Sequence, residues 1–180
     1  MTATVSALHR SSAYTFSKES VPEVRLLAGL GVEDDVHCGS TVRHRSRVER
    51  DPNQPNLRQV HLFDAEILAA LAAEGFALTP GILGENITVA GLDSLSLPTG
   101  TLLRLGDEAL VALTGIRNPC AQIEARFPGL LKRMVHRDES GELHRITGAM
   151  AVVVQAGTVR VGDPIAVQVP PGATLPLQLV

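Results

Sequence analysis

Short runs of apolar residues, many of them alternating with polar ones, dominate the chain. The clearest runs are residues 58–63, 86–89, 101–105, 109–114, 148–155 and 165–169. Turn-forming pairs such as Pro80-Gly81 and Gly106-Asp107 lie between these runs. Short runs bounded by turn residues are typical of β-strands. The pattern predicts a mainly β chain whose strands form a small closed or nearly closed, β-barrel-like structure.

Two stretches have the features of helices instead. The first covers about residues 65–74, where Asp64 is a good N-cap and the apolar residues repeat with helical spacing. The second is expected to begin at Asn118, with Pro119 in the first helical position. Pro128 must break this helix and leave a second short piece after it. We therefore expect an α+β class with few helices.

The length of 180 residues suits one domain and is short for two. The longest apolar run, residues 67–73, is too short to span a membrane, and the N-terminus has no signal-peptide pattern. These features predict a soluble cytoplasmic protein with no membrane partner. A net charge of −3, with four Phe, one Tyr and no Trp, also argues against a nucleic-acid partner.

Arginine supplies most of the positive charge, because Lys18 and Lys132 are the only lysines among 16 basic residues. Arginine binds carboxylates and phosphates with a fork of donors, so an anion site here should be built from arginine. Residues 39–57, which we call the arginine loop, hold a cluster at positions 43–47 and lack an apolar face. Two interpretations stay open, a solvated loop or a mobile loop that grips an anion over a pocket.

Cys120 is the strongest candidate for a reactive residue. The predicted helix start places it in the first turn, where free backbone N–H groups favour an anion. Arg117 adds a positive charge nearby. Both features favour the thiolate, the form that attacks sulfur or binds a soft metal. The alternative is a small buried apolar residue, which is a common role of free cysteine.

Cys38 has a weaker case as a functional residue. It lies far from Cys120 in the chain, and neither cysteine shows the ligand spacing of a structural zinc site. Both thiols are expected to be reduced in a cytoplasmic protein, with a redox-sensitive Cys38–Cys120 pair as the alternative. The neighbouring His37 could bind a ligand or simply fix a turn through Asp35.

Two further segments offer polar residues to a pocket. Arg58 and His61 belong to one predicted strand but point to opposite faces of it, so a straight strand does not easily bring both into one pocket. Residues 80–86 form a glycine-punctuated loop that could bring backbone donors close to a ligand. Glu85 and Asn86 would then contact the ligand or close the turn. This loop matches neither nucleotide-binding glycine motif.

Taken in order, several segments of the chain resemble the MOSC family, the C-terminal domain of molybdenum-cofactor sulfurases. They are residues 16–18, 31–39, 58–62, 80–87, 91–93, 114–120 and 157–163. The resemblance covers nearly all of the chain and implies a single domain over residues 1–180, of the stand-alone bacterial type. It implies a β-barrel-like fold with a few helices. It also implies that Cys120 is the signature cysteine of the family, a persulfide carrier or a molybdenum ligand.

The resemblance further implies the molybdenum cofactor (molybdopterin) as ligand. Lys18, Arg117 and Asn118 fall where relatives contact the phosphate and the pterin of the cofactor. The candidate contacts are completed by His37, Arg58, His61, Glu85 and Asn86. Pyridoxal phosphate is not expected, because that association belongs to a fused domain of larger relatives. The chain departs from the family pattern at Asp34, where glycine is frequent, and at Cys38, where a small residue is frequent.

Three functions stay open at this level. The first is a protein that handles the cofactor or its sulfur through Cys120, supplied by a sulfur-donor protein. The second is a molybdenum-cofactor-dependent reductase of N-hydroxylated substrates, which needs a separate electron-donor protein. The third is a barrel that binds a phosphorylated or other anionic small molecule without catalysis. The fold does not decide between them, because one fold supports many functions.

Overall fold

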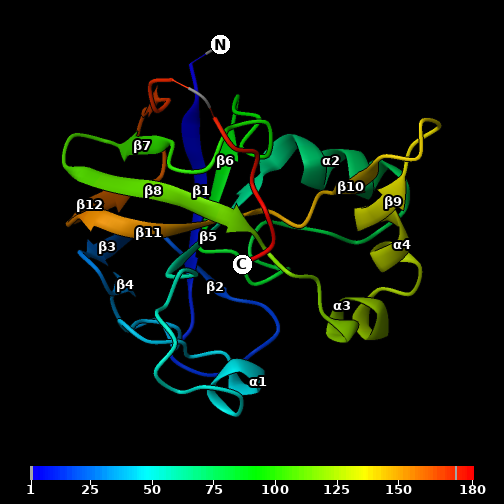
Figure 1. Cartoon of the computed structure of the whole chain (residues 1–180), viewed down its shortest axis with the longest axis horizontal. Helices are drawn as coiled ribbons and strands as arrows, with labels where there is room; N and C mark the ends of the chain where they lie inside the picture. Colours follow the sequence, from blue (N-terminus) through cyan, green and yellow to red (C-terminus); the bar gives the residue numbers. More distant parts are fainter. Residues whose placement is uncertain (1, 173) are drawn as a thin grey trace.

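An eight-stranded sheet forms the centre of the computed structural model, which describes residues 2–172 and 174–180 (Figure 1). Its members are β1 (Thr4–Arg10), β2 (Glu19–Val21), β5 (Val60–Asp64), β6 (Ile87–Ala90), β7 (Leu102–Leu105), β8 (Ala109–Ile116), β11 (Ala149–Gln155) and β13 (Ile165–Gln168). The strand order is β13-β7-β8-β11-β5-β6-β1-β2. Only β5 and β6 pair in parallel, and every other neighbouring pair is antiparallel.

Smaller elements surround this sheet. A second sheet joins β3 (Glu23–Leu27), β4 (Gly31–Val32) and β12 (Gly157–Arg160), and a separate hairpin joins β9 (Val135–Arg137) to β10 (Leu143–Arg145). The helices are α1 (Arg45–Val48), α2 (Ala65–Ala73), α3 (Ala121–Arg126) and α4 (Leu130–Met134). Figure 1 shows α2, α3, α4 and the hairpin on one side of the sheet, and α1 alone below it. In the described residues, no helix is long and apolar enough to cross a membrane.

The mainly β class with few helices agrees with the sequence-based expectation, and each of the six predicted runs contains a strand. The expected barrel is not confirmed. In the described part of the chain, β13 and β2 end the strand order and are not paired with each other. Alternation along a strand decides which side chains are buried, but it carries no information about pairing between the two outermost strands.

The core divides into two groups of apolar side chains. The larger group fills the space between the two sheets and follows strict alternation, as in β8, where Ala109, Val111 and Leu113 are buried and the residues between them are half-buried. The smaller group lies under the helices and includes Phe63, Leu68, Leu71, Ile123, Leu130 and Met134. This second group fixes α3 and α4 against the body of the protein.

Helix α2 begins where the sequence predicts, with Asp64 at the N-cap position, but the Asp64 side chain makes no capping hydrogen bond. Its Oδ2 accepts a hydrogen bond from the Ser94 backbone N–H at 2.9 Å. The Asp64 carboxyl group is thereby directed to the loop after β6, and it is almost fully buried there. Burial raises the pKa of Asp64 to about 6, while the hydrogen bond to Ser94 partly opposes this increase.

The predicted start of the second helix is wrong by three residues. Residues 117–120 are irregular, α3 begins only at Ala121, and Cys120 is its N-cap with φ −118° and ψ 157°. A proline disfavours the helical conformation in the residue before it, so Asn118 cannot start the helix readily. Cys120 therefore does not lie in a first helical turn. The break near Pro128 is confirmed, because α3 ends at Arg126 and α4 follows Gly129.

The C-terminal segment lies alongside the end of β8 (Figure 1). The Ile116 N–H donates to the Gln178 carbonyl at 2.7 Å, and the Val180 N–H donates to the Ile116 carbonyl at 3.3 Å. Gly115 faces this segment so closely that a Cβ atom there would overlap with the Gln178 carbonyl and a Val180 methyl group. The strand that leads to residues 117–120 is thus covered by the last residues of the chain.

Candidate functional site

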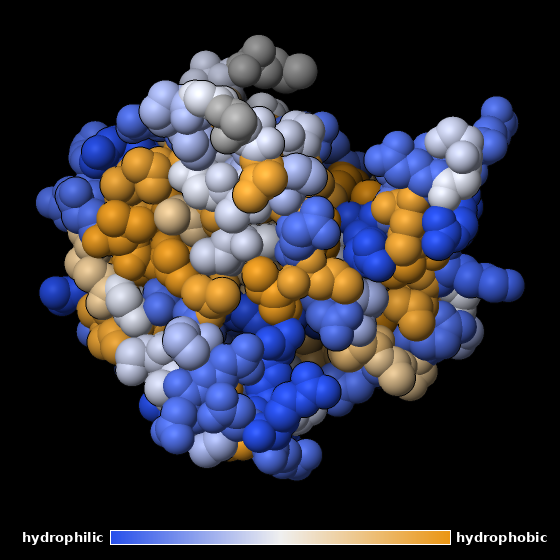
Figure 2. Space-filling view, viewed as in Figure 1, coloured by the Kyte–Doolittle hydropathy of each residue, from blue (hydrophilic) through white to orange (hydrophobic). Residues whose placement is uncertain are grey.

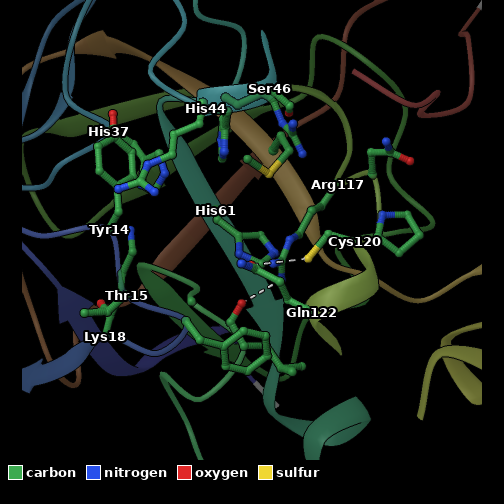
Figure 3. Close-up of a pocket in the computed structure, with 18 of the residues that line it drawn as sticks. Tyr14, Thr15, Lys18, His37, His44, Ser46, His61, Arg117, Cys120 and Gln122 are labelled. Carbon is green, nitrogen blue, oxygen red and sulfur yellow. Dashed lines mark hydrogen bonds between the residues drawn. The ribbon is translucent and has the colours of Figure 1, made fainter. Parts of the chain in front are cut away.

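A cavity of about 440 Å³ lies between the start of β5, the segment before α3 and the arginine loop (Figure 3). Eight of the nine candidate residues from the sequence line it, namely Lys18, His37, Arg58, His61, Asn86, Arg117, Asn118 and Cys120. These residues come from five separate stretches of the chain, and the fold brings them together. The glycine-punctuated loop at residues 80–86 faces the same cavity as Cys120, with Gly84 and Asn86 in its wall.

Glu85 is not among the residues that line the cavity, and its side chain takes the second role that the sequence left open, closing the turn. Its side chain is fully buried, and Oε1 accepts hydrogen bonds from the Gly81 N–H at 2.5 Å and the Thr88 hydroxyl at 3.4 Å. Adjacent residues of an extended segment point in opposite directions, so Asn86 faces the cavity side while Glu85 points into the protein. Burial raises the pKa of Glu85. The carboxyl group closes the glycine-rich loop.

Asp35 organises the opposite wall of the cavity. Its carboxylate accepts hydrogen bonds from Lys18 Nζ at 2.7 Å, Asn86 Nδ2 at 3.1 Å and the His37 N–H at 3.0 Å. Burial alone would raise the pKa of Asp35, but the hydrogen bonds from His37 and Lys18 hold it well below its usual range. The expected turn through His37 is confirmed, and Lys18 enters the cavity wall with its charge already balanced.

The residue before Asp35 adopts a left-handed backbone conformation. Asp34 has a φ of 61° and is the one non-glycine residue with positive φ in the described part of the chain. Aspartate tolerates this left-handed conformation better than most residues. The replacement of a frequent glycine at this position is therefore compatible with an unchanged turn.

Arg58 and Arg117 differ from Lys18, because no carboxylate lies within 4 Å of either guanidinium in the described residues. Arg58 is only 8% exposed, and its Nε has no hydrogen-bond partner there. Burial, together with the charges of Arg47 and Arg117, lowers the pKa of Arg58 to about 10. Two neighbouring cations that form no salt bridge favour an anion in the cavity.

Arg117 connects this positive wall to Cys120. Its Nη1 donates to the Leu83 carbonyl at 2.6 Å, and its guanidinium lies beside the Cys120 side chain. Burial lowers the pKa of Arg117, while the nearby Cys120 and Glu85 side chains oppose this change. Figure 3 shows Arg117 and Cys120 side by side at the cavity wall. The arginine therefore places a positive charge against the sulfur, as the sequence predicts.

Arg58 and His61 both line the cavity, contrary to the sequence-based expectation. Strand β5 begins only at Val60, so Arg58 lies in the irregular segment before it and does not follow strand alternation. His61 is buried, and its Nε2 lies 3.1 Å from the Thr147 carbonyl. A carbonyl only accepts, so Nε2 donates; burial lowers the pKa of His61 well below its usual value and keeps the ring neutral.

The cysteines occupy different environments. Cys120 is half-buried and opens into the cavity, with Sγ 3.8 Å from Gln122 Oε1. Cys38 does not line the cavity, and its pKa is raised by burial and by the nearby charge of Asp35. Both thiols are free, so the Cys38–Cys120 pair is not formed in this structure. Cys120 is the thiol that a cavity ligand can reach.

The arginine loop forms one wall of the cavity through α1 and the residue before it. Residues 44–47 line the cavity, whereas Arg43 does not. The Tyr14 hydroxyl donates to the Arg43 carbonyl at 2.7 Å, and the Arg45 guanidinium lies 4.8 Å from the Tyr14 ring centre. Figure 2 shows strongly hydrophilic residues gathered over this part of the molecule. This placement favours the anion-gripping interpretation of the loop for Arg45 and Arg47.

Sequence reasoning missed two aromatic side chains of this wall. The His44 ring lies 4.4 Å from the His37 ring, and Tyr14 meets His37 edge-on at 5.8 Å. Burial, together with the charges of Arg58 and other neighbours, lowers the pKa of His44 to about 3 and keeps its ring neutral. The position of His44 inside an arginine cluster and the status of Tyr14 as the single tyrosine were the available signals.

Comparison with known proteins defines the family. The model of the MOSC domain matches residues 33–166, and the chain belongs to the MOSC domain family. The fold is similar to the crystal structure of YuaD from Bacillus subtilis, with a TM-score of 0.73 and 24% identity over 93% of this chain and 96% of that chain. It is also similar to YiiM from Geobacillus stearothermophilus, with a TM-score of 0.66 and 19% identity over 97% of this chain and 79% of that chain.

A curated relative from Gibberella moniliformis carries the name "Reductase". It is 29% identical over 87 residues, which cover 47% of this chain and 14% of that protein. The chain thus matches only a small part of the length of this relative.

Proposed function

We propose that this MOSC domain handles the molybdenum cofactor or its sulfur in the cavity beside Cys120. The observation that carries the proposal is the juxtaposition of a free thiol with two guanidinium groups that lack acidic partners. Cys120, Arg58 and Arg117 all line one cavity of about 440 Å³. A phosphorylated ligand with a soft metal or a reactive sulfur matches this combination of groups.

The residues present fit such a cofactor in charge and in ligand chemistry. Arg58 Nε is a buried donor without a partner in the described residues, and it is available to a phosphate oxygen. Arg117 lies beside the sulfur of Cys120 and adds positive charge. Asn118 offers a polar side chain at the exposed edge of the cavity. Lys18 contributes less than the family resemblance implies, because Asp35 already balances its charge.

The chemistry of Cys120 in this proposal takes one of two forms. As a metal ligand, its thiolate would hold molybdenum, and the bound cofactor would supply two-electron redox chemistry. As a sulfur carrier, its thiolate would attack the outer sulfur of a donor protein's persulfide. The donor thiolate would leave, and Cys120 would become the persulfide. In both forms the adjacent Arg117 guanidinium stabilises negative charge on sulfur.

The test is analysis of protein purified from the cells that naturally produce it. Molybdenum is measured by mass spectrometry, pterin by fluorescence after oxidation, and persulfide by cyanolysis. The proposal expects at least one of these groups on the native protein. Cys120→Ser should remove molybdenum or persulfide, and Arg58→Met should lower the pterin content. If the native protein carries no molybdenum, no pterin and no persulfide, the proposal fails and a cavity that only binds anions is the better description.

A second candidate is a molybdenum-cofactor-dependent reductase of N-hydroxylated substrates. The relative named "Reductase" and the partial exposure of Cys120 at the cavity favour it. Such a reaction draws two electrons from a separate donor protein. Cofactor-loaded protein supplied with chemically reduced methyl viologen should then reduce a benzamidoxime, and Cys120→Ser should abolish the turnover. A cofactor-loaded protein that oxidises no viologen in the presence of benzamidoxime would favour cofactor handling over reduction.

A further inference from the structure

The β9–β10 hairpin has four side chains of kinds that bind metals, at alternate positions along the strands and into the turn. They are His136, Asp138, Glu142 and His144, in a symmetric arrangement around the turn. His136 and His144 are direct register partners, and the Asp138 N–H donates to the Glu142 carbonyl at 3.0 Å one step further along. Alternate residues of a strand project to one face, so all four side chains share one face of the hairpin.

This face is separate from the cavity, since none of the four residues lines it. Figure 1 shows the hairpin as an arm that projects from the body beyond α4, and its tip is hydrophilic in Figure 2. One ligand atom from each of Asp138, Glu142 and His144 lies within 4.8 Å of the other two. The His136 and His144 rings stack with centres 5.5 Å apart and planes at 22°. Three possible ligand atoms already converge, and a second imidazole lies beside them.

A hydrogen bond to a backbone carbonyl fixes the orientation of the His136 ring, as is usual for histidines that bind metals. Its Nδ1 lies 3.1 Å from the Arg133 carbonyl. A carbonyl only accepts, so Nδ1 carries the proton, and the neutral ring keeps its lone pair on Nε2. Metal-binding histidines typically donate their other ring N–H to a carbonyl or carboxylate in this manner. The Arg133 carbonyl is not part of the hairpin face. Its contact with Nδ1 leaves the lone pair of His136 Nε2 free to bind a cation.

Asp138 is also fixed in place before any ion arrives. Its Oδ1 accepts hydrogen bonds from the Ser140 N–H at 2.9 Å, the Ser140 hydroxyl at 2.7 Å and the Glu142 N–H at 3.0 Å. These contacts leave Oδ2 to accept a hydrogen bond from His144 Nε2 at 2.7 Å, and a metal ion bound by both atoms would replace that proton. The carboxylate therefore loses little conformational freedom when Oδ2 binds a metal ion.

We propose that this face of the hairpin binds a divalent transition-metal ion of the Zn²⁺ type. Asp138, Glu142 and His144 supply three ligands, and His136 supplies the fourth. Two imidazoles with two carboxylates form a mixed nitrogen and oxygen set, which suits zinc, nickel or copper better than the all-oxygen preference of magnesium and calcium. The site uses no residue of the cavity and does not depend on the function proposed above.

Zn²⁺ titration by calorimetry on the full chain tests this proposal. The titrated protein carries Cys120→Ser, which removes the cavity thiol as a competing zinc ligand. We expect one Zn²⁺ to bind per chain. His144→Ala and Glu142→Gln should each weaken binding by at least about tenfold, the effect typical of losing even an outer contact of a metal site. His136→Ala should also weaken it, whereas a purely structural histidine would leave the affinity unchanged.

Glu139→Gln is the matched control, because Glu139 is an exposed acid of the same turn that lies outside the alternating set. It should leave the Zn²⁺ affinity unchanged. Equal weakening by Glu139→Gln and Glu142→Gln would mean that only the charge of the hairpin matters, and would overturn the site. Absence of Zn²⁺ binding, or binding that His144→Ala leaves intact, would overturn it as well. The fold of each variant is checked by circular dichroism without metal.

Discussion

The Asp35 carboxylate and the Lys18 ammonium form an ion pair at 2.7 Å, with side chains that are only 2% and 5% exposed. Removing one partner of a buried pair leaves the other charge without compensation and typically costs about 3–5 kcal/mol. We therefore expect Asp35→Asn to lower the free energy of unfolding by roughly that amount. Urea unfolding of Asp35→Asn, Lys18→Met and the double variant measures it. A coupling energy close to zero between the two sites would contradict the role given to this pair.

Asp64 should make stability depend on pH between about 4 and 6. Its pKa is raised to about 6 in the folded protein, against roughly 3.9 in an unfolded chain. The folded state therefore favours the protonated carboxyl, and this advantage is lost as the pH rises through 6. Asp64→Asn does not titrate, so its stability relative to wild type should increase by about 2 kcal/mol from pH 4 to pH 7. Urea midpoints across this range test the prediction, and a constant difference would refute it.

Arg58→Met should weaken anion binding without lowering the stability of the protein. The substitution removes a buried charge that has no acidic partner, so the ligand-free protein should be as stable as wild type or more stable. The substitution should weaken sulfate binding by about 1.5–3 kcal/mol, the usual contribution of a hydrogen bond to a charged group. Melting temperatures in sulfate and in chloride report both effects. Arg104→Met, on the exposed face of β7, is the control that should keep the sulfate response.

Cys120 should react with iodoacetamide faster than Cys38. Cys120 opens into the cavity against the Arg117 guanidinium, while burial and the Asp35 charge raise the pKa of Cys38 and reduce its thiolate. We expect a difference of at least about fivefold near pH 7.5. Peptide mass spectrometry over a time course resolves the two sites. Equal rates, or faster labelling of Cys38, would show that Arg117 does not activate the cavity thiol.

Gly148→Ala should be much more damaging than Gly162→Ala. Both glycines have positive φ, 87° and 95°, so alanine is strained at either position. At Gly148 a Cβ atom would also meet His61 Nε2, the Leu62 carbonyl and Phe63 Cδ2 within 2.9 Å, whereas at Gly162 nothing lies within 4 Å. Gly162→Ala should cost about 1–2 kcal/mol and Gly148→Ala distinctly more. Similar losses of stability in the two variants would show that the backbone near His61 shifts easily to accommodate the alanine.

The strands were predictable because their burial follows local alternation. The apolar positions of β8 and the glycines between strands are visible in the sequence and require no knowledge of distant contacts. The beginning of α3 was not predicted, because the preference of proline for the first helical turn competes with its effect on the residue before it. In this chain the second effect decides the conformation of Asn118.

The cavity wall was predictable by residue type more than by geometry. Alternation separates Arg58 from His61 only if the strand starts before Arg58, and β5 starts two residues later. For Glu85 the sequence left open a ligand contact or a turn-closing role, and in the structure its carboxyl group closes the loop from inside. Neither outcome could be read from the sequence, because both depend on where one strand begins and which way one side chain turns.

The cover that residues 178–180 place over Gly115 and Ile116 has a consequence for handling the protein. Ile116 precedes Arg117 directly, so the short C-terminal clamp restrains the backbone that presents Arg117 and Cys120 to the cavity. Loss of residues 177–180 would free this edge and would also remove Leu177 from the main core. Such a loss should therefore alter the cavity as well as lower the stability of the molecule.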